Sequence, residues 1–313
     1  MVFRRFGDCE SDTLGTGSGR CDIRSFGDPR GIILFQKGWS LPVGADLAAT
    51  LTETIYKSQL AQLIAFPLTE LYNFEQPTPE NEKNTSSTGI LTEVRAGKPQ
   101  FSFMYDKGSC FHKALYDKRG KNRWDLGIIF ETGVLLASNQ AATEIRGFDM
   151  GMLSVETFKF VQGTDPEMST AMIQLVDADQ FNDKHEFFTF DALGFNMNLI
   201  DGVVELSLSY NVAPTATTSI VLDVVGSCNA DELVAGLDDA ANWRLGGTQA
   251  SATTIDSIAY DAVNGRYTLT LTPTLATGDT VQPELFNSTD SVRVVEDATG
   301  TQYKGRAPLA TIA

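Results

Sequence analysis

Alternating apolar and polar residues recur along the chain and predict a mainly β protein. Phe101, Phe103 and Tyr105 alternate with polar or less bulky neighbours between residues 100 and 106, which is the period-two pattern of a strand with one buried face. The pattern returns twice, at Trp124, Leu126, Ile128 and Phe130, and at Tyr267, Leu269 and Leu271. We therefore expect strands in both halves of the chain.

One helix is expected near residues 50–65. Thr50-Leu-Thr-Glu53 has the Ser/Thr-x-x-Glu form of a capping box, and apolar residues follow at mostly helical spacing until Pro67. Residues 74–89 are instead poor in apolar side chains and dense in Pro, Asn, Ser and charge, which favours an exposed loop flanked by strands.

A second, short helix is expected between the strands at 100–106 and 124–130. Gly108 and Ser109 can begin it, and Gly120 can end it. Its buried side would carry Phe111, Ala114 and Leu115, so His112 would point away from that side. The basic run 118–121 would then be an exposed turn between helix and strand.

The clearest domain boundary lies near Thr215. In NVAPTATTS, residues 211–219, a strand-like run gives way to Pro, Ala and Thr without periodicity. Beyond it, short strand-like runs alternate with turn signals, among them Asn264-Gly265 and Thr277-Gly278-Asp279. We expect an antiparallel β-sandwich at 215–313, a strand-led domain at 46–214, and at 1–45 an N-terminal arm that a neighbouring subunit orders.

The C-terminal segment YDAVNGRYTLTLTPTLATGDTV, residues 260–281, resembles the immunoglobulin-like domains of bacteria and their viruses. The Cys-Trp-Cys pattern of antibody domains is missing, because Cys228 stands alone and Trp243 follows it too closely. The resemblance therefore implies an immunoglobulin-like β-sandwich without an inter-sheet disulfide.

The order of elements over residues 66–210 is similar to that of the major tail tube proteins of tailed bacteriophages. A polar loop is followed by TEVRAGKPQFSFMYDKG, a short helix, RWDLGIIFE, VLLASNQAATEIRG and GFDMGMLSVETFKFV. In that family a β-sandwich with a flanking helix forms rings, usually hexamers, whose long hairpins join into a barrel around a DNA-conducting lumen. An outer immunoglobulin-like domain also occurs there.

This resemblance implies a tail-tube-like β-sandwich or barrel with a flanking helix, followed by the C-terminal sandwich. The implied function is that of a structural virion protein, made in the host cytoplasm and located in the viral tail. Its partners would be further copies of itself in stacked rings, other tail proteins, and DNA that passes through without specific binding. The hairpins would come from strands around 66–95 and 123–160, since joined hairpins leave no strand edge exposed.

The charge of the chain fits a conduit for DNA. The sequence has 40 Asp and Glu against 24 Lys and Arg, a net charge of -16, which repels phosphate backbones and anionic lipid. Acidic side chains on a lumen would keep DNA mobile. The lumen candidates are Asp125 and Glu131, on the strand face opposite Trp124, and Glu144 and Glu156, across the predicted turn.

Residues suited to catalysis or metal binding are sparse. The cysteines, at 9, 21, 110 and 228, are scattered without paired spacing, and neither His112 nor His185 lies in a metal-binding motif. Residues 14–20 lack the Lys-Ser/Thr ending of a phosphate loop, and residues 176–183 lack the glycine and glutamate of a calcium loop. We expect no enzyme activity, metal, cofactor or membrane span, since no apolar run approaches about 18 residues.

Two other functions stay open. Immunoglobulin-like domains decorate viral heads as readily as tails, so a capsid decoration protein or head-to-tail joining protein is one alternative. A carbohydrate-binding surface module is the other, because β-sandwiches with exposed aromatic residues commonly bind glycans.

Overall fold

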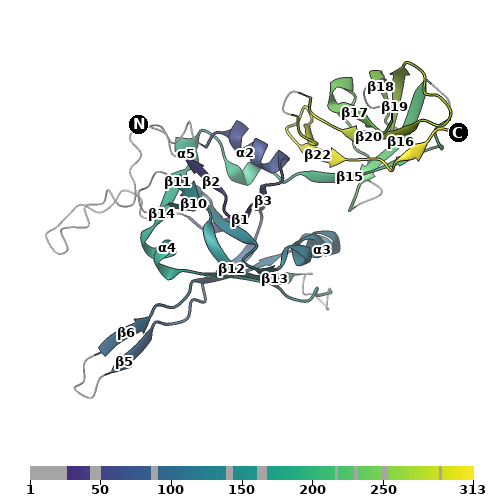
Figure 1. The fold of residues 1–313 in the computed structure, drawn as a ribbon. Coiled ribbons are helices and arrows are strands. Elements are labelled where there is room, and N and C mark those ends of the chain that lie inside the picture. The colour runs from purple at the N-terminus through teal and green to yellow at the C-terminus, as the bar shows by residue number, and fades with distance from the viewer. Residues whose placement is uncertain are drawn as a thin grey trace. The chain divides into compact units, whose positions relative to one another are not determined.

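The computed structural model describes residues 27–42, 51–85, 91–138, 144–160, 168–215, 218–228, 232–248, 253–288 and 291–313. The chain divides into two compact units: an N-terminal unit, Met1–Gln59 with Ile64–Ile200, and a C-terminal unit, Leu60–Leu63 with Asp201–Ala313. Both are mainly β, which confirms the predicted fold class (Figure 1).

The N-terminal unit is built on one curled sheet. The strands of this unit are β1 (Pro29–Gln36), β2 (Ser40–Pro42), β3 (Ala65–Leu68), β4 (Tyr72–Glu75), β5 (Glu82–Thr85), β6 (Leu91–Arg95), β7 (Gln100–Tyr105), β8 (Gly120–Lys121), β9 (Trp124–Phe130), β10 (Gly133–Ser138), β11 (Glu144–Arg146), β12 (Phe148–Val155), β13 (Ser169–Leu175) and β14 (His185–Thr189). The helices are α2 (Glu53–Ala61), α3 (Gly108–Lys118), α4 (Ala178–Asp183) and α5 (Phe190–Leu193).

The order of strands in this sheet is β2-β11-β10-β9-β12-β13-β7-β4. Four further strands extend it: β1 pairs with β9 and β3, β14 pairs with β10, and β8 pairs with β12. Only β5 and β6, among the described strands of this unit, lie outside the sheet.

Strand β9 is buried on both faces, so the alternation expected there is incomplete. Leu126 and Ile128 face the main core, as expected. Asp125 and Ile129, which belong to the opposite face of the strand, are buried too. A Cβ placed on Gly127 would lie 2.9 Å from a Leu136 methyl carbon, which shows how closely a second apolar layer covers the other face. A polar residue on a strand covered from both sides has no access to bulk water.

Strand β1 overturns the expectation that all of residues 1–45 form an arm. It lies between β9 and β3, and Ile32, Ile33 and Leu34 are fully buried. The continuous apolar run GIILF, rather than an alternation, is typical of a strand that is buried on both faces. Residues 1–26 and 43–45 of the expected arm lie outside the described residues.

Helix α2 is shorter than expected. The hydroxyl of Thr52 accepts a hydrogen bond from the backbone N–H of Ile55 at 3.2 Å, so Thr52 caps the helix, while Thr50 lies outside the described residues. The helix ends at Ala61, and Leu63 takes a φ of 58°. Pro67 is already part of β3, which pairs with β1 alone among the described strands, and such an edge position tolerates proline.

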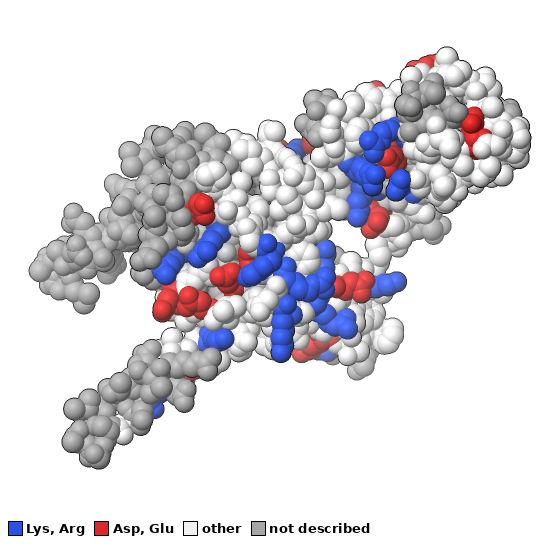
Figure 2. Space-filling model, viewed as in Figure 1, with Lys and Arg blue, Asp and Glu red and all other residues white. Residues whose placement is uncertain are grey.

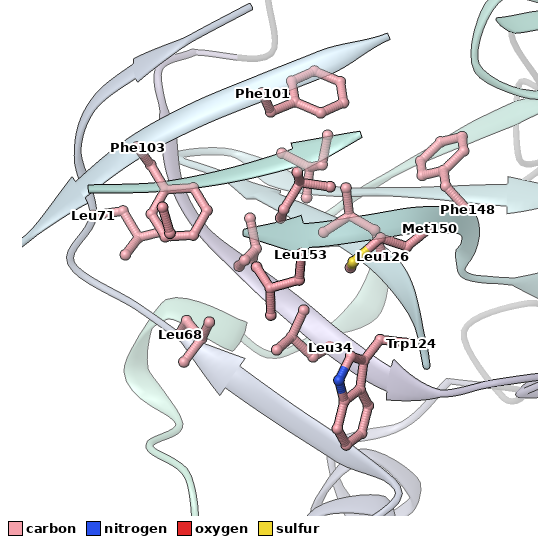
Figure 3. Packing of buried hydrophobic residues seen from close by; sticks show 14 of the residues in the cluster. Leu34, Leu68, Leu71, Phe101, Phe103, Trp124, Leu126, Phe148, Met150 and Leu153 are labelled. Atoms are coloured by element: carbon pink, nitrogen blue, oxygen red, sulfur yellow. The ribbon is translucent and has the colours of Figure 1, made fainter. Parts of the chain in front are cut away.

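The apolar side chains of the curled sheet meet in one core (Figure 3). The predicted alternation in β7 is confirmed, since Phe101, Phe103 and Tyr105 are all buried. Phe181 of α4 packs against Phe101 and Phe148, with ring centroids 5.3 and 5.5 Å apart. At roughly 1.5–3 kcal/mol for each large apolar side chain removed from water, such contacts supply most of the stability of the unit.

The C-terminal unit is a β-sandwich. Its strands are β15 (Val204–Tyr210), β16 (Ser219–Gly226), β17 (Trp243–Gly246), β18 (Thr254–Asp261), β19 (Arg266–Thr272), β20 (Thr280–Leu285), β21 (Val295–Glu296), β22 (Gln302–Gly305) and β23 (Ala310–Thr311). One sheet has the order β18-β19-β16-β15-β22-β21, and the other has the order β17-β20-β23.

The core of the sandwich confirms the alternation predicted for β19. Tyr267, Leu269 and Leu271 are buried, with threonines between them. The Tyr267 hydroxyl donates to the carbonyl of Val234 at 2.8 Å, and the indole N–H of Trp243 donates to the carbonyl of Leu237 at 2.7 Å. The polar tips of these aromatic side chains are thus paired inside the core.

Strands β18 and β19 form the predicted hairpin, with a turn longer than two residues. Asp261 pairs with Arg266, and the Asp261 carboxylate accepts hydrogen bonds from the backbone of Val263 and from the backbone and side chain of Asn264. The side-chain bond from Asn264 is the main cause that lowers the pKa of Asp261. Only Gly265 in this turn takes a positive φ, of 65°.

The C-terminal unit begins earlier than the expected boundary near Thr215. Strand β15 pairs with β16 in antiparallel fashion and with β22 in parallel fashion, so it belongs to the C-terminal sheet. The Pro/Ala/Thr segment that suggested a boundary is therefore a connection between two strands of one unit, which starts at Asp201.

Candidate assembly surface

Strands β5 and β6 form a two-stranded ribbon that pairs with no other described strand (Figure 1). The backbone register runs from Glu82 opposite Arg95 to Thr85 opposite Leu91. Here a strand occupies part of the segment 74–89 that was expected to be a loop. An isolated two-stranded ribbon is marginally stable in water, and both of its outer edges have backbone groups available for pairing.

The base of the ribbon is closely packed. The backbone N–H of Gly97 donates to the Asn81 side-chain carbonyl at 2.9 Å, and that of Gln100 donates to the Thr78 hydroxyl at 3.3 Å. A Cβ placed on Gly97 would lie 1.8 Å from the Pro79 carbonyl oxygen, a distance that no packing change of side chains can relieve. Gly97 therefore allows the two backbone segments at the base of the ribbon to approach each other closely. A single glycine in the sequence does not reveal this role.

The second range expected to give a hairpin, 123–160, is different. Its strands β9 and β10 are buried members of the curled sheet, with Ile129 opposite Val134 and Ile128 opposite Leu135. Residues 139–143 lie outside the described part of the chain. Within the described residues, the unsupported ribbon comes from the 66–95 range alone.

Asp125, one of the four lumen candidates, does not lie on a solvated strand face. Its side chain is only 4% exposed, and it accepts hydrogen bonds from the Lys37 ammonium at 2.7 Å and the Gly38 backbone N–H at 2.7 Å. Lys37 also pairs with Asp149 at 2.6 Å. The three side chains join the β1–β2 turn to β9 and β12 at one end of the sheet.

The pKa values of this ion-pair group follow from burial and contact. Burial is the largest cause that raises the pKa of Asp125, while Lys37 and the Gly38 backbone oppose it. The hydrogen bonds from Lys37 to Asp125 and Asp149 outweigh partial burial and raise the pKa of Lys37. Lys37 thus stays an ammonium ion at neutral pH and serves as a structural cation. The sequence could not identify it, because its two partners lie far along the chain.

The other three lumen candidates are more exposed. Glu131 follows the end of β9 and accepts a hydrogen bond from Arg30 Nε at 3.0 Å. Glu144 begins β11 and is exposed, and Glu156 follows the end of β12, half exposed, 3.1 Å from Lys159. The structure does not gather the candidates into one patch. Glu131 follows the C-terminal end of β9 and Glu156 follows the C-terminal end of β12, and these two ends point in opposite directions because the strands are antiparallel.

An open pocket of about 530 Å³ lies beside Glu131. The Asn198 amide donates to the Phe130 carbonyl at 2.9 Å, but its own carbonyl oxygen is buried without a hydrogen bond. Backbone strain accompanies the pocket, since Glu70 takes a φ of 56°. The lining residues are Arg30, Thr69, Glu70, Leu71, Tyr72, Glu131 and Asn198.

The buried face of helix α3 matches the expected one in part. Leu115 is buried and Phe111 packs half-buried against the core, as expected, but His112 is also buried and Ala114 is exposed. The Tyr105 hydroxyl lies 2.7 Å from Nδ1 of His112, and the imidazole is enclosed by the rings of Tyr105, Tyr116 and Phe158. The expected direction of His112 was therefore wrong, because a neutral histidine with a hydrogen-bond partner can be buried.

The basic residues after α3 complete the end of the helix. Arg119 donates to the Tyr116 carbonyl at 2.9 Å, and Arg123 donates to the Asp117 carbonyl at 3.0 Å. Lys118 Nζ lies 3.4 Å from the centroid of the Phe66 ring. Cations at a helix C-terminus satisfy carbonyls that lack intrahelical partners. Arg119 and Lys121 of the run are exposed, as expected, but Lys118 and Gly120 are half-buried, and Gly120 and Lys121 form the short strand β8.

The cysteines differ from the scattered thiols that the sequence suggested. Cys110 and Cys228 are both disulfide-bonded, and no described cysteine is free. Cysteine spacing alone does not give connectivity. No group of three or more His, Cys, Asp or Glu in the described residues is arranged to hold a metal ion. Among the described helices, none is long and apolar enough to cross a membrane.

Comparison with known proteins gives no family assignment: no protein-family model and no curated protein sequence matches the chain.

Proposed function

We propose that the chain is a structural virion protein: the subunit of a phage tail tube that polymerises as stacked rings around a DNA-conducting lumen. The observation that carries the proposal is the ribbon of β5 and β6, which extends from a mainly β unit and has both outer edges unpaired among the described strands. In this proposal the C-terminal sandwich is an outer domain.

The ribbon suits ring formation for a physical reason. Its strands pair only with each other, so neither strand gains the ladder hydrogen bonds of a central strand. When ribbons of neighbouring copies join edge to edge, each copy supplies the partner that the next one lacks, and a closed ring leaves no free edge. If the rotation that relates neighbouring subunits brings the last copy back to the first, the copies form a closed ring. Rings stacked on one another form a tube.

The charge distribution supports the same function. The net charge of -16 opposes retention of DNA by the protein surface. Glu144 and Glu156 are exposed and stay our candidates for the lumen wall, together with Glu131. Asp125 does not border the lumen in this proposal, because its carboxylate is occupied by Lys37 and Gly38.

Negative-stain electron microscopy of the purified protein tests the proposal. We expect tubes or stacked rings, in an amount that rises with protein concentration. Discrete small oligomers at every concentration would instead favour a capsid decoration protein or a head-to-tail joining protein.

A further inference from the structure

The C-terminal unit carries a concentrated positive site on an acidic surface. Residues 201–313 contain 14 Asp and Glu but only five Lys and Arg. Three of these five, Arg244, Arg293 and Arg306, lie around a single carboxylate, that of Glu284. Figure 2 shows the gathering of basic side chains around an acidic one on this unit.

Strand pairing brings these side chains together. Glu284 lies in β20 opposite Arg244 of β17, and on its other side it forms an isolated bridge with Arg306. Residues directly opposite each other in paired strands share a face of the sheet. Val281 and Leu285 of β20 belong to the core, so Glu284, out of step with them, faces outward. Its side chain is nevertheless only 3% exposed, because the arginines cover it.

One carboxylate does not satisfy three guanidinium groups. Arg244 donates to Glu284 Oε1 through Nε, at 2.8 Å, and through Nη2. Oε2 receives no hydrogen bond, although Nε of Arg293 and of Arg306 lie 3.4 and 3.3 Å away. Two positive charges are therefore left over at the site, and the arginine side chains are 38%, 61% and 48% exposed for Arg244, Arg293 and Arg306.

The remaining guanidinium N–H groups are exposed to solvent. Within the described part of the chain, the side chains of Arg293 and Arg306 lie near Glu284 but donate no hydrogen bond to the protein. The guanidinium of Arg244 lies 3.6 Å from the centroid of the Phe286 ring, which holds its plane in place. Planar guanidinium groups match the oxygen pairs of phosphate, sulfate and carboxylate groups.

We propose that Arg244, Arg293 and Arg306 form a binding site for one small oxyanion, a phosphate, sulfate or carboxylate group, either free or carried on an acidic saccharide. The anion lies against the exposed guanidinium groups, and Glu284 beneath them holds the arginines close together. Without that carboxylate, three guanidinium groups would repel each other.

The surrounding charge favours a discrete anion over a nucleic acid. A nucleic-acid backbone presents many phosphates and needs an extended basic surface, with about one counterion released for each phosphate neutralised. Residues 201–313 contain 14 acidic and five basic residues, an excess of nine acidic residues. This excess would repel any phosphates that lie beyond the site. A single oxyanion gains the attraction of the arginines without contacting the acidic surroundings.

Calorimetric titration of the full chain tests the site. The probes are inorganic phosphate, trigalacturonate, neutral maltotriose and a short DNA duplex, at low ionic strength. We expect phosphate and trigalacturonate to bind, maltotriose and DNA not to bind, and 0.5 M sodium chloride to abolish binding. Tighter binding of trigalacturonate than of phosphate would identify a saccharide-borne anion, and the reverse order a free one.

The decisive variant is Arg293→Gln/Arg306→Gln, which leaves the Arg244–Glu284 pair in place. We expect affinity to fall about tenfold or more, equal to about 1.4 kcal/mol. Arg266→Gln is the matched control, because Arg266 is similarly exposed in the same unit and pairs with Asp223. It should change affinity less than about twofold, within the range expected of a distant surface charge.

Three outcomes would overturn the site: no binding of either small anion to the wild-type protein, equal binding by the double variant, or binding of DNA alone. NMR of the arginine Nε–H groups in the wild-type protein gives a second measurement if the double variant does not fold. The resonances of Arg293 and Arg306 should shift with phosphate, and that of Arg266 should not.

Discussion

The Tyr105 hydroxyl and Nδ1 of His112 lie 2.7 Å apart and join strand β7 to helix α3. Burial raises the pKa of Tyr105 to about 12, so the phenol keeps its proton at neutral pH. Burial also lowers the pKa of His112, so the imidazole is neutral in the folded protein. The helix is thus held to the sheet by a pair of uncharged groups.

The stability of the protein should therefore fall in mild acid. The unfolded chain binds a proton at His112 near pH 6.5, whereas the folded chain does so only at lower pH. Between these values the unfolded state binds more protons, so the free energy of unfolding decreases as pH falls below about 6.5. Urea unfolding of wild type and His112→Gln between pH 7.5 and 5 measures this. The variant should lose less stability over that range, and equal losses would contradict the assignment.

Tyr105→Phe separates the hydrogen bond from the titration. It removes the hydroxyl but leaves a buried histidine, so we expect a cost of about 1–2 kcal/mol at pH 7.5. The decrease in acid should persist, because His112 still becomes protonated on unfolding. Urea unfolding at the same pH values measures both effects.

Removal of Lys37 should destabilise the N-terminal unit. Lys37→Met leaves the buried Asp125 carboxylate with the Gly38 N–H but without its cation. Breaking a buried ion pair costs about 3–5 kcal/mol, and we expect about 2 kcal/mol here because Lys37 is 39% exposed. Thermal unfolding checks the change. Asp125→Asn in the Lys37→Met background should recover part of the loss, and no recovery would argue against the pairing as the cause.

The raised pKa of Lys37 adds a pH dependence at the alkaline end. A cation whose folded pKa exceeds its unfolded value contributes stability below pH 10.5, and this contribution is lost as pH rises through the folded pKa. Wild type should therefore lose more stability than Lys37→Met between pH 9 and pH 11. If wild type and Lys37→Met lost equal stability over this pH range, the two aspartates would not raise the pKa of Lys37.

Gly97→Ala should block assembly while the fold survives. The new Cβ would meet the Pro79 carbonyl at 1.8 Å, so the backbone at the base of the ribbon must move. Gly97 lies outside the main core, and we expect thermal unfolding to change by only a few degrees. Asn81→Ala, which removes one hydrogen bond at the same place, should have a milder effect on the yield of tubes. Normal tubes from Gly97→Ala would exclude the ribbon as the assembling element.

A charge reversal on exposed glutamates tests the lumen. Glu144→Lys/Glu156→Lys replaces a negative by a positive charge at each position, a change of two charge units that is repeated around every ring. If these residues border DNA, ejection should slow, and more so at low salt, because screening is weaker there. The matched control, Glu144→Gln/Glu156→Gln, halves the charge change and should slow ejection less. Normal ejection at every ionic strength would place both residues elsewhere.

The sequence predicted strands best where one face is buried and the other is wet. The alternation in β7 and β19 is confirmed residue by residue, because period-two burial is a local property. No strand was predicted over β1, and the alternation predicted in β9 is incomplete, since both faces of these strands are covered by parts of the chain that are distant in sequence. Asp125 was misplaced for the same reason.

Polar residues in the interior were the hardest to predict. The buried Asp125 depends on Lys37, which is 88 residues away, and Glu284 depends on three arginines from other parts of the chain. These partners meet through strand register and packing, which no local pattern encodes. His112 depends on Tyr105, which is only seven residues away but lies on a different element. The base of the ribbon at Gly97 is similar, because a close backbone approach leaves no periodic signal.

The pairing of β1 with β9 also sets the order in which the chain can fold during synthesis. Pro29 lies opposite Phe130, so β1 can pair early with β3 but lacks its β9 neighbour until the ribosome has released a segment about a hundred residues later. Contacts of such long range slow folding and leave apolar strands exposed in the meantime. The GIILF segment therefore keeps one apolar strand edge uncovered during synthesis until β9 is made.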